Sequence, residues 1–239
     1  MKQAAPELSE LIRYEYHDDK ICFLQLHLGG DRNFCYLLGD VPSGSAVAVD
    51  PGFEAQQFAG ISAARNLKIG KILITHSHPD HIAQAETLAS ITGARLYAGE
   101  KEKLSGALPL RDGEALPLGQ QTIVALLTPG HSPGHLCFLF EKRLVTGDLL
   151  FCGKVGGTGI HFPGSSPAEE WDSLKRITGF PDAICVFPGH DYYGGEGEMP
   201  HSTIGYEKQH NPFLLCKNFE AFLDLKNNWD SYKREHGIK

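Results

Sequence analysis

The sequence predicts an α+β fold in which β-sheets are sandwiched by helices. Short apolar runs separated by turn residues fill residues 12–50 and 120–147, as expected for strands. Apolar residues recur at a helical interval in residues 54–66, 82–91 and 167–178. Strands come first along the chain and are then mixed with helices, which favours sheets covered by helices over an all-helical or all-strand fold.

The first half of the chain alternates predicted strands with helices. Residues 20–28 and 33–38 are apolar runs separated by Gly29-Gly30-Asp31, and the run 46–49 stops at Asp50-Pro51-Gly52. Apolar residues then recur on one face of a predicted helix, at Phe58, Ile61 and Ala64. Residues 71–75 form a buried strand that stops at a histidine cluster, and a helix over 82–91 and a strand over 94–98 follow.

The second half begins with strands punctuated by proline and glycine. A helix is predicted from Pro167, which a first helical turn tolerates, and Trp171, Leu174 and Ile177 share one of its faces. Residues 183–187 form a short strand, and residues 218–236 are predicted to form one amphipathic helix.

Length and composition limit the classes of protein. The 239 residues suit one large domain or one domain with a short appendage, and 41% hydrophobic residues suffice for a sizeable core. The net charge is −7 and no basic stripe is present, so nucleic acid is not expected as a partner.

Neither export nor membrane insertion is indicated by the apolar pattern. No apolar run approaches the ~20 residues of a membrane span, and residues 1–10 lack the apolar core of a signal peptide. The six cysteines are scattered, which favours buried free thiols over a disulfide framework. We therefore expect a cytoplasmic protein without membrane contact.

The segment Thr75 to His81 carries the strongest chemical signal. It holds His76, His78, Asp80 and His81 directly after an apolar strand. Imidazole nitrogens suit zinc and iron, and a carboxylate adds a harder ligand. A solvated polar loop is the alternative, but four metal-competent residues at this spacing disfavour it.

Further candidates stand where other predicted strands meet loops. His131 and His135 lie among the turn formers of residues 128–135, Asp148 follows the apolar pair Leu144-Val145, and His190 follows the strand 183–187. Each alone fits a surface residue. Together they repeat one placement, and strand ends on one rim are where sheet proteins assemble sites.

These residues, in this order, resemble the signature of the metallo-β-lactamase superfamily, over about residues 33–190. The resemblance implies a four-layer αββα sandwich over residues 1–200, followed by a short helical extension over 201–239 packed on it. One metal would be held by His76, His78 and His131. A second would be held by Asp80, His81 and His190. Asp148 would bridge the two metals, and Asp80 and Asp148 would be the catalytic carboxylates. Asp50 would orient a ligand histidine, and His135 would lie beside the site without binding metal.

Such a ligand set implies two divalent metal ions, with zinc favoured over iron or manganese. It leaves room for a water or hydroxide between the ions, and metal binding lowers the pKa of water from ~16 to ~7. The expected reaction is therefore hydrolysis by a metal-bound hydroxide.

Within the superfamily, the segments Asn33–Leu37, Thr146–Phe151 and Gly153-Lys154 resemble hydroxyacylglutathione hydrolase (glyoxalase II). The resemblance implies a small thioester or thiol-linked substrate, with Lys154 and Tyr192 binding the thiol carrier. A solvated Lys154 is the plain alternative. The chain departs from glyoxalase II after His190, where only about fifty residues follow in place of a longer helical domain.

Three hypotheses follow from the site. The first is a binuclear thioester hydrolase. The second is a mononuclear non-haem iron persulfide dioxygenase of the same superfamily, with His76, His131 and Asp148 as a facial triad. The third, a non-catalytic metal-binding module, is disfavoured because an open bridging position serves chemistry rather than ligand saturation.

Overall fold

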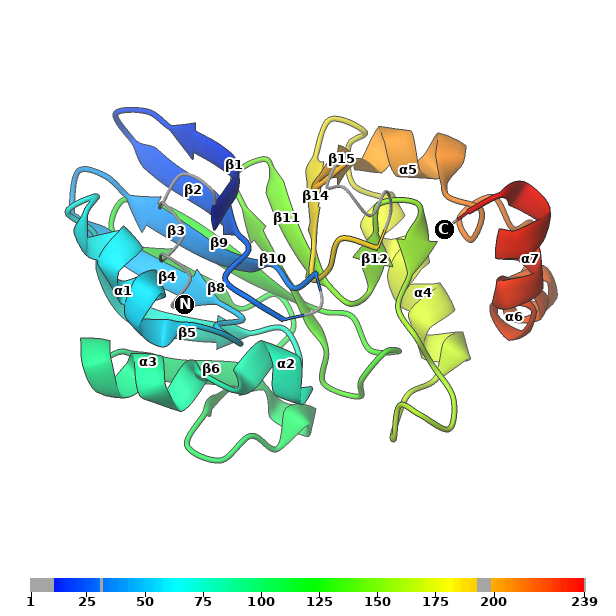
Figure 1. Cartoon of the computed structure of the whole chain (residues 1–239), viewed down its shortest axis with the longest axis horizontal. Coiled ribbons are helices and arrows are strands. Elements are labelled where there is room, and N and C mark those ends of the chain that lie inside the picture. The colour runs from blue at the N-terminus through cyan, green and yellow to red at the C-terminus, as the bar shows by residue number, and fades with distance from the viewer. Residues whose placement is uncertain (1–10, 31, 193–198, 239) are drawn as a thin grey trace, which may run out of the picture.

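The computed structural model describes residues 11–30, 32–192 and 199–238, which form four layers (Figure 1). Two β-sheets face each other and helices cover both outer faces. The first sheet has seven strands in sequential order. They are β1 (Ile12–His17), β2 (Ile21–Leu26), β3 (Cys35–Asp40), β4 (Ser45–Val49), β5 (Lys68–Ile74), β6 (Arg95–Gly99) and β7 (Leu108–Leu110).

The second sheet has six strands in the order β15-β14-β11-β10-β9-β8. They are β8 (Ala115–Leu118), β9 (Gln121–Leu127), β10 (Leu136–Phe140), β11 (Arg143–Gly147), β14 (Cys185–Pro188) and β15 (Ser202–Thr203). A separate hairpin joins β12 (Leu150–Phe151) to β13 (Lys154–Val155). The parallel pairs β4–β5 and β11–β14 bring their carboxyl ends to the site described below.

Strand alternation explains why both faces of each sheet are buried. In β2, Leu24 belongs to the apolar cluster under the first helical layer, whereas its neighbour Phe23 belongs to the cluster between the sheets. In the second sheet, Phe138 faces the space between the sheets and Cys137 faces the helices on the far side. Three apolar layers thus hold four layers of backbone together, and the expected αββα sandwich is confirmed.

The helices divide between the two outer faces (Figure 1). On the first sheet lie α1 (Ala55–Ala63), α2 (Pro79–Ile82) and α3 (Ala85–Thr92), with Phe58 and Leu88 in their apolar cluster. On the second sheet lie α4 (Pro167–Thr178) and α5 (Ile204–His210), and α6 (Phe219–Asn227) packs against α4. The side chain of Ser166 caps α4 by accepting from the Glu169 amide, so the helix begins at Pro167 as predicted.

Two of the predicted helices are divided differently in the structure. The single helix expected over residues 218–236 is wrong: it breaks at Asn228 into α6 and α7 (Trp229–His236). Asn228 adopts a non-helical backbone, and its side-chain amide donates to the Asp224 backbone carbonyl at 3.0 Å, so a local hydrogen bond competes for a carbonyl of the helix. The helix expected over 82–91 is likewise preceded by the short α2, which begins at Pro79.

The C-terminal segment contacts the second sheet through its first residues, whereas α7 contributes no buried residue. Strand β15 pairs with β14, and Ile204, Phe213 and Phe222 join the same apolar cluster as Leu174 of α4. The domain boundary at residue 200 stays a prediction. All six cysteines are unpaired, as expected, and four of them are buried.

None of the helices in the described part of the chain combines the length and apolar content that a membrane span requires. Residues 1–10, for which the sequence predicts no signal peptide, lie outside the described residues.

Candidate metal centre

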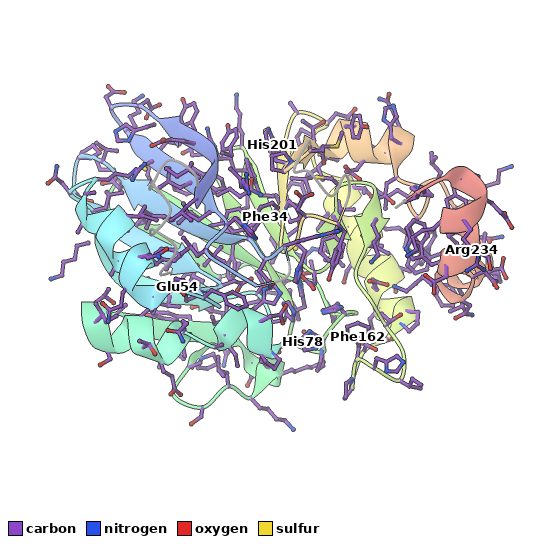
Figure 2. All side chains as sticks on the ribbon, in the orientation of Figure 1. Phe34, Glu54, His78, Phe162, His201 and Arg234 are labelled. Atoms are coloured by element: carbon purple, nitrogen blue, oxygen red, sulfur yellow. The ribbon has the colours of Figure 1, made fainter. Side chains whose placement is uncertain are left out.

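The ends of strands from both sheets deliver the candidate ligands to one place. His76 follows β5 of the first sheet, while Asp148 follows β11 and His190 follows β14 of the second sheet. His131 stands in the loop between β9 and β10. Figure 2 shows His78 beside Phe162 between the two halves of the molecule, with their ring centroids 5.9 Å apart. The structure therefore brings together segments that lie more than one hundred residues apart in the sequence.

The first group of donors contains His76, His78 and His131, each of which offers a nitrogen within 4.8 Å of the others. His131 Nε2 lies 2.9 Å from His78 Nδ1. Asp148 Oδ2 is 3.6 Å from His131 Nε2 and 4.0 Å from His76 Nε2. Asp148 thus lies beside this group of donors, at distances that suit a fourth ligand of one ion.

The second group contains Asp80, His81 and His190. His190 Nε2 lies 3.3 Å from Asp80 Oδ2 and 3.2 Å from His81 Nε2. Asp148 reaches this group as well, with Oδ1 3.4 Å from His81 Nε2 and Oδ2 3.4 Å from His190 Nε2. The Asp148 carboxylate thus contacts donors of both groups.

Hydrogen bonds from outside the groups fix which nitrogen of each ring faces inward. Asp50 Oδ2 lies 3.0 Å from His81 Nδ1, and a carboxylate can only accept, so Nδ1 carries the proton and Nε2 presents a lone pair. His131 Nδ1 donates to the Gly157 carbonyl at 2.7 Å with the same result. The hydroxyl of Thr75 donates to Asp50 at 2.5 Å and lies 3.0 Å from His76 Nδ1, which orients the third ring.

The charge state of the residues fits metal ions. Burial holds the pKa of His76 well below its ordinary value and lowers the pKa of His131 to about 4, so both rings are neutral and able to coordinate. Burial opposes ionisation of Asp148, but His190 and His81 beside it hold its pKa well below the usual range. Burial also lowers the pKa of His190, but Asp148 and Asp80 outweigh it and raise that pKa to about 10. The carboxylates of Asp80 and Asp148 thus stabilise positive charge in the centre.

Two buried atoms in the centre support the same conclusion. His76 Nε2 and Asp148 Oδ1 have no hydrogen-bond partner among the described residues. A buried polar atom without a partner costs free energy, so such atoms are rare unless an ion or water satisfies them. Both atoms belong to residues of the centre described above, and the residues present therefore fit a pair of divalent cations.

Comparison with known proteins places the chain in a family. The model of the metallo-beta-lactamase superfamily matches residues 28–190. The chain belongs to this superfamily. The resemblance predicted from the sequence is therefore confirmed, and with it the coarse expectation of a fold from the metal-dependent hydrolase superfamily.

The relatives cover most of the chain. A probable polyketide biosynthesis zinc-dependent hydrolase, PksB of Bacillus subtilis, is 30% identical over 87% of this chain and 92% of its own length. A hydroxyacylglutathione hydrolase of Francisella tularensis subsp. novicida is 35% identical over 75% of this chain and 71% of its own length. The crystal structure of ETHE1 from Myxococcus xanthus superposes with a TM-score of 0.79 at 30% identity, covering 87% of this chain and 91% of that one.

Both ring nitrogens of His135 have hydrogen-bond partners, so neither is available to bind an ion. Its Nε2 accepts from the backbone amide of Asp148 at 3.2 Å, and its Nδ1 lies 3.0 Å from the hydroxyl of Thr128. Burial lowers the pKa of His135 to about 3, so the ring is neutral. The structure thus gives His135 a different task from His131: it holds the backbone of Asp148.

Two glycines beside Asp148, Gly156 and Gly189, are required by close approach. A Cβ at Gly189 would lie 2.3 Å from Asp148 Oδ1, and a Cβ at Gly156 would lie 1.9 Å from the Asp148 carbonyl oxygen. No side chain fits at either position, so the Pro-Gly-His turn serves packing around the carboxylate as well as turn geometry.

A pocket of about 300 Å³ opens beside the centre. His131 and Asp148 lie at one end, and Lys154 and Tyr192 line the wall, where the Lys154 ammonium lies 4.3 Å from the centroid of the Tyr192 ring. Burial lowers the pKa of Lys154, and the charge of Lys233 adds to this effect. The two residues expected to bind substrate therefore share a pocket with the candidate ligands.

Lys226 also lines this pocket, but its charge is already compensated. Its ammonium donates to the buried carboxylate of Glu170 and, at 2.7 Å, to the carbonyl of Gly156. Lys154, in contrast, forms no ion pair with any residue of the described part of the chain. An anionic group in the pocket would thus pair with the Lys154 ammonium.

The sequence did not predict a role for Glu102, which lies beside the centre. Its carboxylate contacts the segments that carry His76, His78 and His131. Glu102 stands three residues after the end of β6, which is the strand-end placement that marks the other site residues. The charged run Glu100-Lys101-Glu102-Lys103 obscured this signal, because such a run is usually a solvated surface.

Proposed function

We propose that this chain is a binuclear metal hydrolase that cleaves thioesters in the manner of glyoxalase II. The observation that carries the proposal is the pair of donor groups that share Asp148. His76, His78 and His131 would hold one ion, Asp80, His81 and His190 the other, and Asp148 both. Two divalent ions are the implied cofactors, with zinc favoured and iron or manganese as alternatives.

When bound, the ions supply a hydroxide at neutral pH and a positive charge for the carbonyl oxygen of the substrate. The protein supplies the geometry. Asp148 sets the separation of the two sites, and Asp50 keeps His81 in the tautomer that coordinates. His135 holds the Asp148 backbone, so the carboxylate need not reorganise during turnover.

The substrate side of the proposal rests on the pocket. Lys154 would bind an anionic group of the thiol carrier, and Tyr192 would pack against the carrier beside it. The acyl carbonyl would then lie at the His131 and Asp148 end. A thiolate leaves with a pKa near ~8.5, so thioester cleavage needs no strong general acid, and none stands in the described part of the pocket.

The relatives support hydrolysis of a small thioester. One is described as a zinc-dependent hydrolase and another as a hydroxyacylglutathione hydrolase, and both align over most of this chain. The second activity acts on an acyl group carried by a thiol, which matches the pocket chemistry. Glutathione and other thiol carriers with an anionic group would all pair with the Lys154 ammonium.

One observation favours a second candidate, the mononuclear iron persulfide dioxygenase. His76, His131 and Asp148 converge as two histidines and one carboxylate, the ligand set of non-haem iron oxygenases. This alternative assigns no metal to Asp80, His81 and His190. It therefore predicts one iron per chain, whereas the hydrolase predicts two metals.

A single preparation distinguishes the two. Protein purified without added metal is analysed for zinc, iron and manganese and assayed for thiol release from S-lactoylglutathione and from other acyl-thiols. Two metals per chain, thiol release and loss of activity on chelation support the hydrolase. Oxygen uptake with glutathione persulfide, together with one iron and no thiol release, would refute it in favour of the dioxygenase.

A further inference from the structure

We infer that Glu102 is a positioning residue that sets the geometry of the first metal site, an inference that rests on the proposed metal centre. Glu102 ends a short 3₁₀ turn, η2 (Glu100–Glu102), which follows β6. Only 9% of the residue is exposed. Its side chain does not reach the centre itself, so it would act through the two loops that carry the ligands.

The carboxylate makes four hydrogen bonds, two with each loop. Oε2 accepts from the backbone amide of Ser77 at 2.7 Å and from its hydroxyl at 2.6 Å. Oε1 accepts from the Ser132 hydroxyl at 2.5 Å and from the Gly134 amide at 2.9 Å. Charge-assisted bonds of this length are among the stronger ones in proteins, and here one group uses both of its oxygens.

The position of these serines explains what is held. Ser77 lies between His76 and His78, and Ser132 directly follows His131. All three histidines of the first donor group thus sit on segments that Glu102 joins. These segments come from opposite sheets, because His76 follows β5 and His131 precedes β10. In the second donor group, Asp80 and His81 lie beyond Ser77 in α2 and His190 follows β14, so none of them is a direct neighbour of Ser77, Ser132 or Gly134.

Two glycines show that the contact is built into the packing. A Cβ at Gly134 would lie 2.6 Å from the Glu102 amide nitrogen and 3.0 Å from Oε1. A Cβ at Gly99 would lie 2.0 Å from the Gly134 carbonyl oxygen. Neither glycine has a positive φ, so close approach and not backbone conformation excludes a side chain there. The His131 loop is therefore pressed directly against the turn that carries Glu102.

The physical consequence concerns preorganisation. His131 Nε2 and His78 Nδ1 stand 2.9 Å apart, a distance at which the two neutral rings share a hydrogen bond in the metal-free protein. An ion that binds both nitrogens must replace that bond, and a clamp that holds both loops keeps the two nitrogens in place for this exchange. Loss of such an outer partner typically lowers metal affinity by about 10–100-fold.

The test uses Glu102→Ala and Glu102→Gln in the full chain. Each protein is titrated with zinc in competition with a chromophoric chelator, and the His78→Ala variant identifies which of the two affinities belongs to the first site. We expect Glu102→Ala to weaken the first site by about 10–100-fold and to leave the second near its wild-type value. Glu102→Gln should be intermediate, because one amide oxygen can still serve one loop.

Asp40→Asn is the matched control for a purely structural role. Asp40 is also a fully buried carboxylate that accepts from two backbone amides, those of Ser43 and Gln120, but it touches no ligand loop. The Asp40→Asn substitution should lower the melting temperature of the metal-free protein without changing the affinity of either zinc site. The inference is overturned if Glu102→Ala lowers the melting temperature but binds both zinc ions as the wild type does.

A milder variant covers the case in which Glu102→Ala fails to fold. The double variant Ser77→Ala/Ser132→Ala removes the two hydroxyl donors and keeps the two amide donors. It should weaken the first site selectively, and unchanged affinity would overturn the inference. If the wild type itself binds no pair of metal ions, the proposed function and this inference both fail, whereas failure of the variants alone leaves the proposed function intact.

Discussion

Replacing Asp50 by asparagine tests how the second metal site is oriented. Asp50 is 2% exposed and accepts three hydrogen bonds: from the Thr75 amide at 2.7 Å, from the Thr75 hydroxyl at 2.5 Å and from His81 Nδ1 at 3.0 Å. Asparagine has nearly the same shape but only one acceptor oxygen. If that oxygen stays with the Thr75 amide, the new NH₂ group faces His81 Nδ1.

The consequence for His81 follows from its tautomers. A donor opposite Nδ1 favours the ring form that carries its proton on Nε2, and Nε2 is the atom that faces Asp80, Asp148 and His190. A protonated Nε2 cannot coordinate. We expect the affinity of the second site to fall by about 10–100-fold, or about 1.4–2.8 kcal/mol. The first site should lose less, because Asp50 reaches His76 only through Thr75.

Zinc competition titrations of wild type and Asp50→Asn measure both affinities, with Asp40→Asn as the control for a buried carboxylate far from the ligands. Turnover of an acyl-thioester at saturating zinc is measured on the same samples. Asp50→Asn should need more zinc to reach full activity. Wild-type affinity at both sites, with normal turnover, would show that Asp50 does not orient His81 and would refute the reasoning.

The remaining predictions concern the ligands, the pocket and pH. Asp148→Ala should lower turnover by several orders of magnitude and weaken both metals, since its carboxylate contacts both donor groups; near-normal turnover would contradict the bridge. Metal analysis should find at least one ion missing from His131→Ala and none from His135→Ala, because both nitrogens of His135 are engaged; equal losses would contradict this. Lys154→Met should raise KM for an anionic acyl-thiol while kcat changes little, and a neutral acyl-thiol should show no such rise. The pKa of His190 is raised from 6.5 to about 10, so its charged form stabilises the metal-free protein fully below pH 6.5, and this stability is lost as pH rises through about 10. The melting temperature of the metal-free protein should therefore fall as the pH rises from 6.5 to about 10, and it should fall less in His190→Gln. An equal fall in both proteins would contradict this role of His190.

The sequence by itself determined the layers of the fold and the chemistry of the site. Short apolar runs, each ended by turn residues, are local features, and they predicted most strands of both sheets. The placement of His76, Asp148 and His190 after such runs could likewise be recognised, because the end of a strand is marked by its own neighbours. The order of these residues then sufficed to predict the superfamily.

Other features were decided only by the tertiary structure. The resemblance already predicted that His135 lies beside the site without binding metal, but its role came only from the structure, in which its Nε2 accepts from the amide of Asp148, 13 residues away. Glu102 looked like part of a solvated charged run, and only the packing of one loop against another buried it. The break at Asn228 rests on a side-chain hydrogen bond that competes with continued helix.

The physical reason is the range of the interactions. Side-chain alternation and turn formation act between near neighbours, so the sequence records them directly. The metal centre forms where two sheets meet, and its distances are set by apolar packing between residues such as Phe23 of β2 and Phe187 of β14, whose rings lie 4.5 Å apart. The sequence therefore determined which ligands are present, whereas the packing of the two sheets determined which of them meet and which carboxylate holds their loops together.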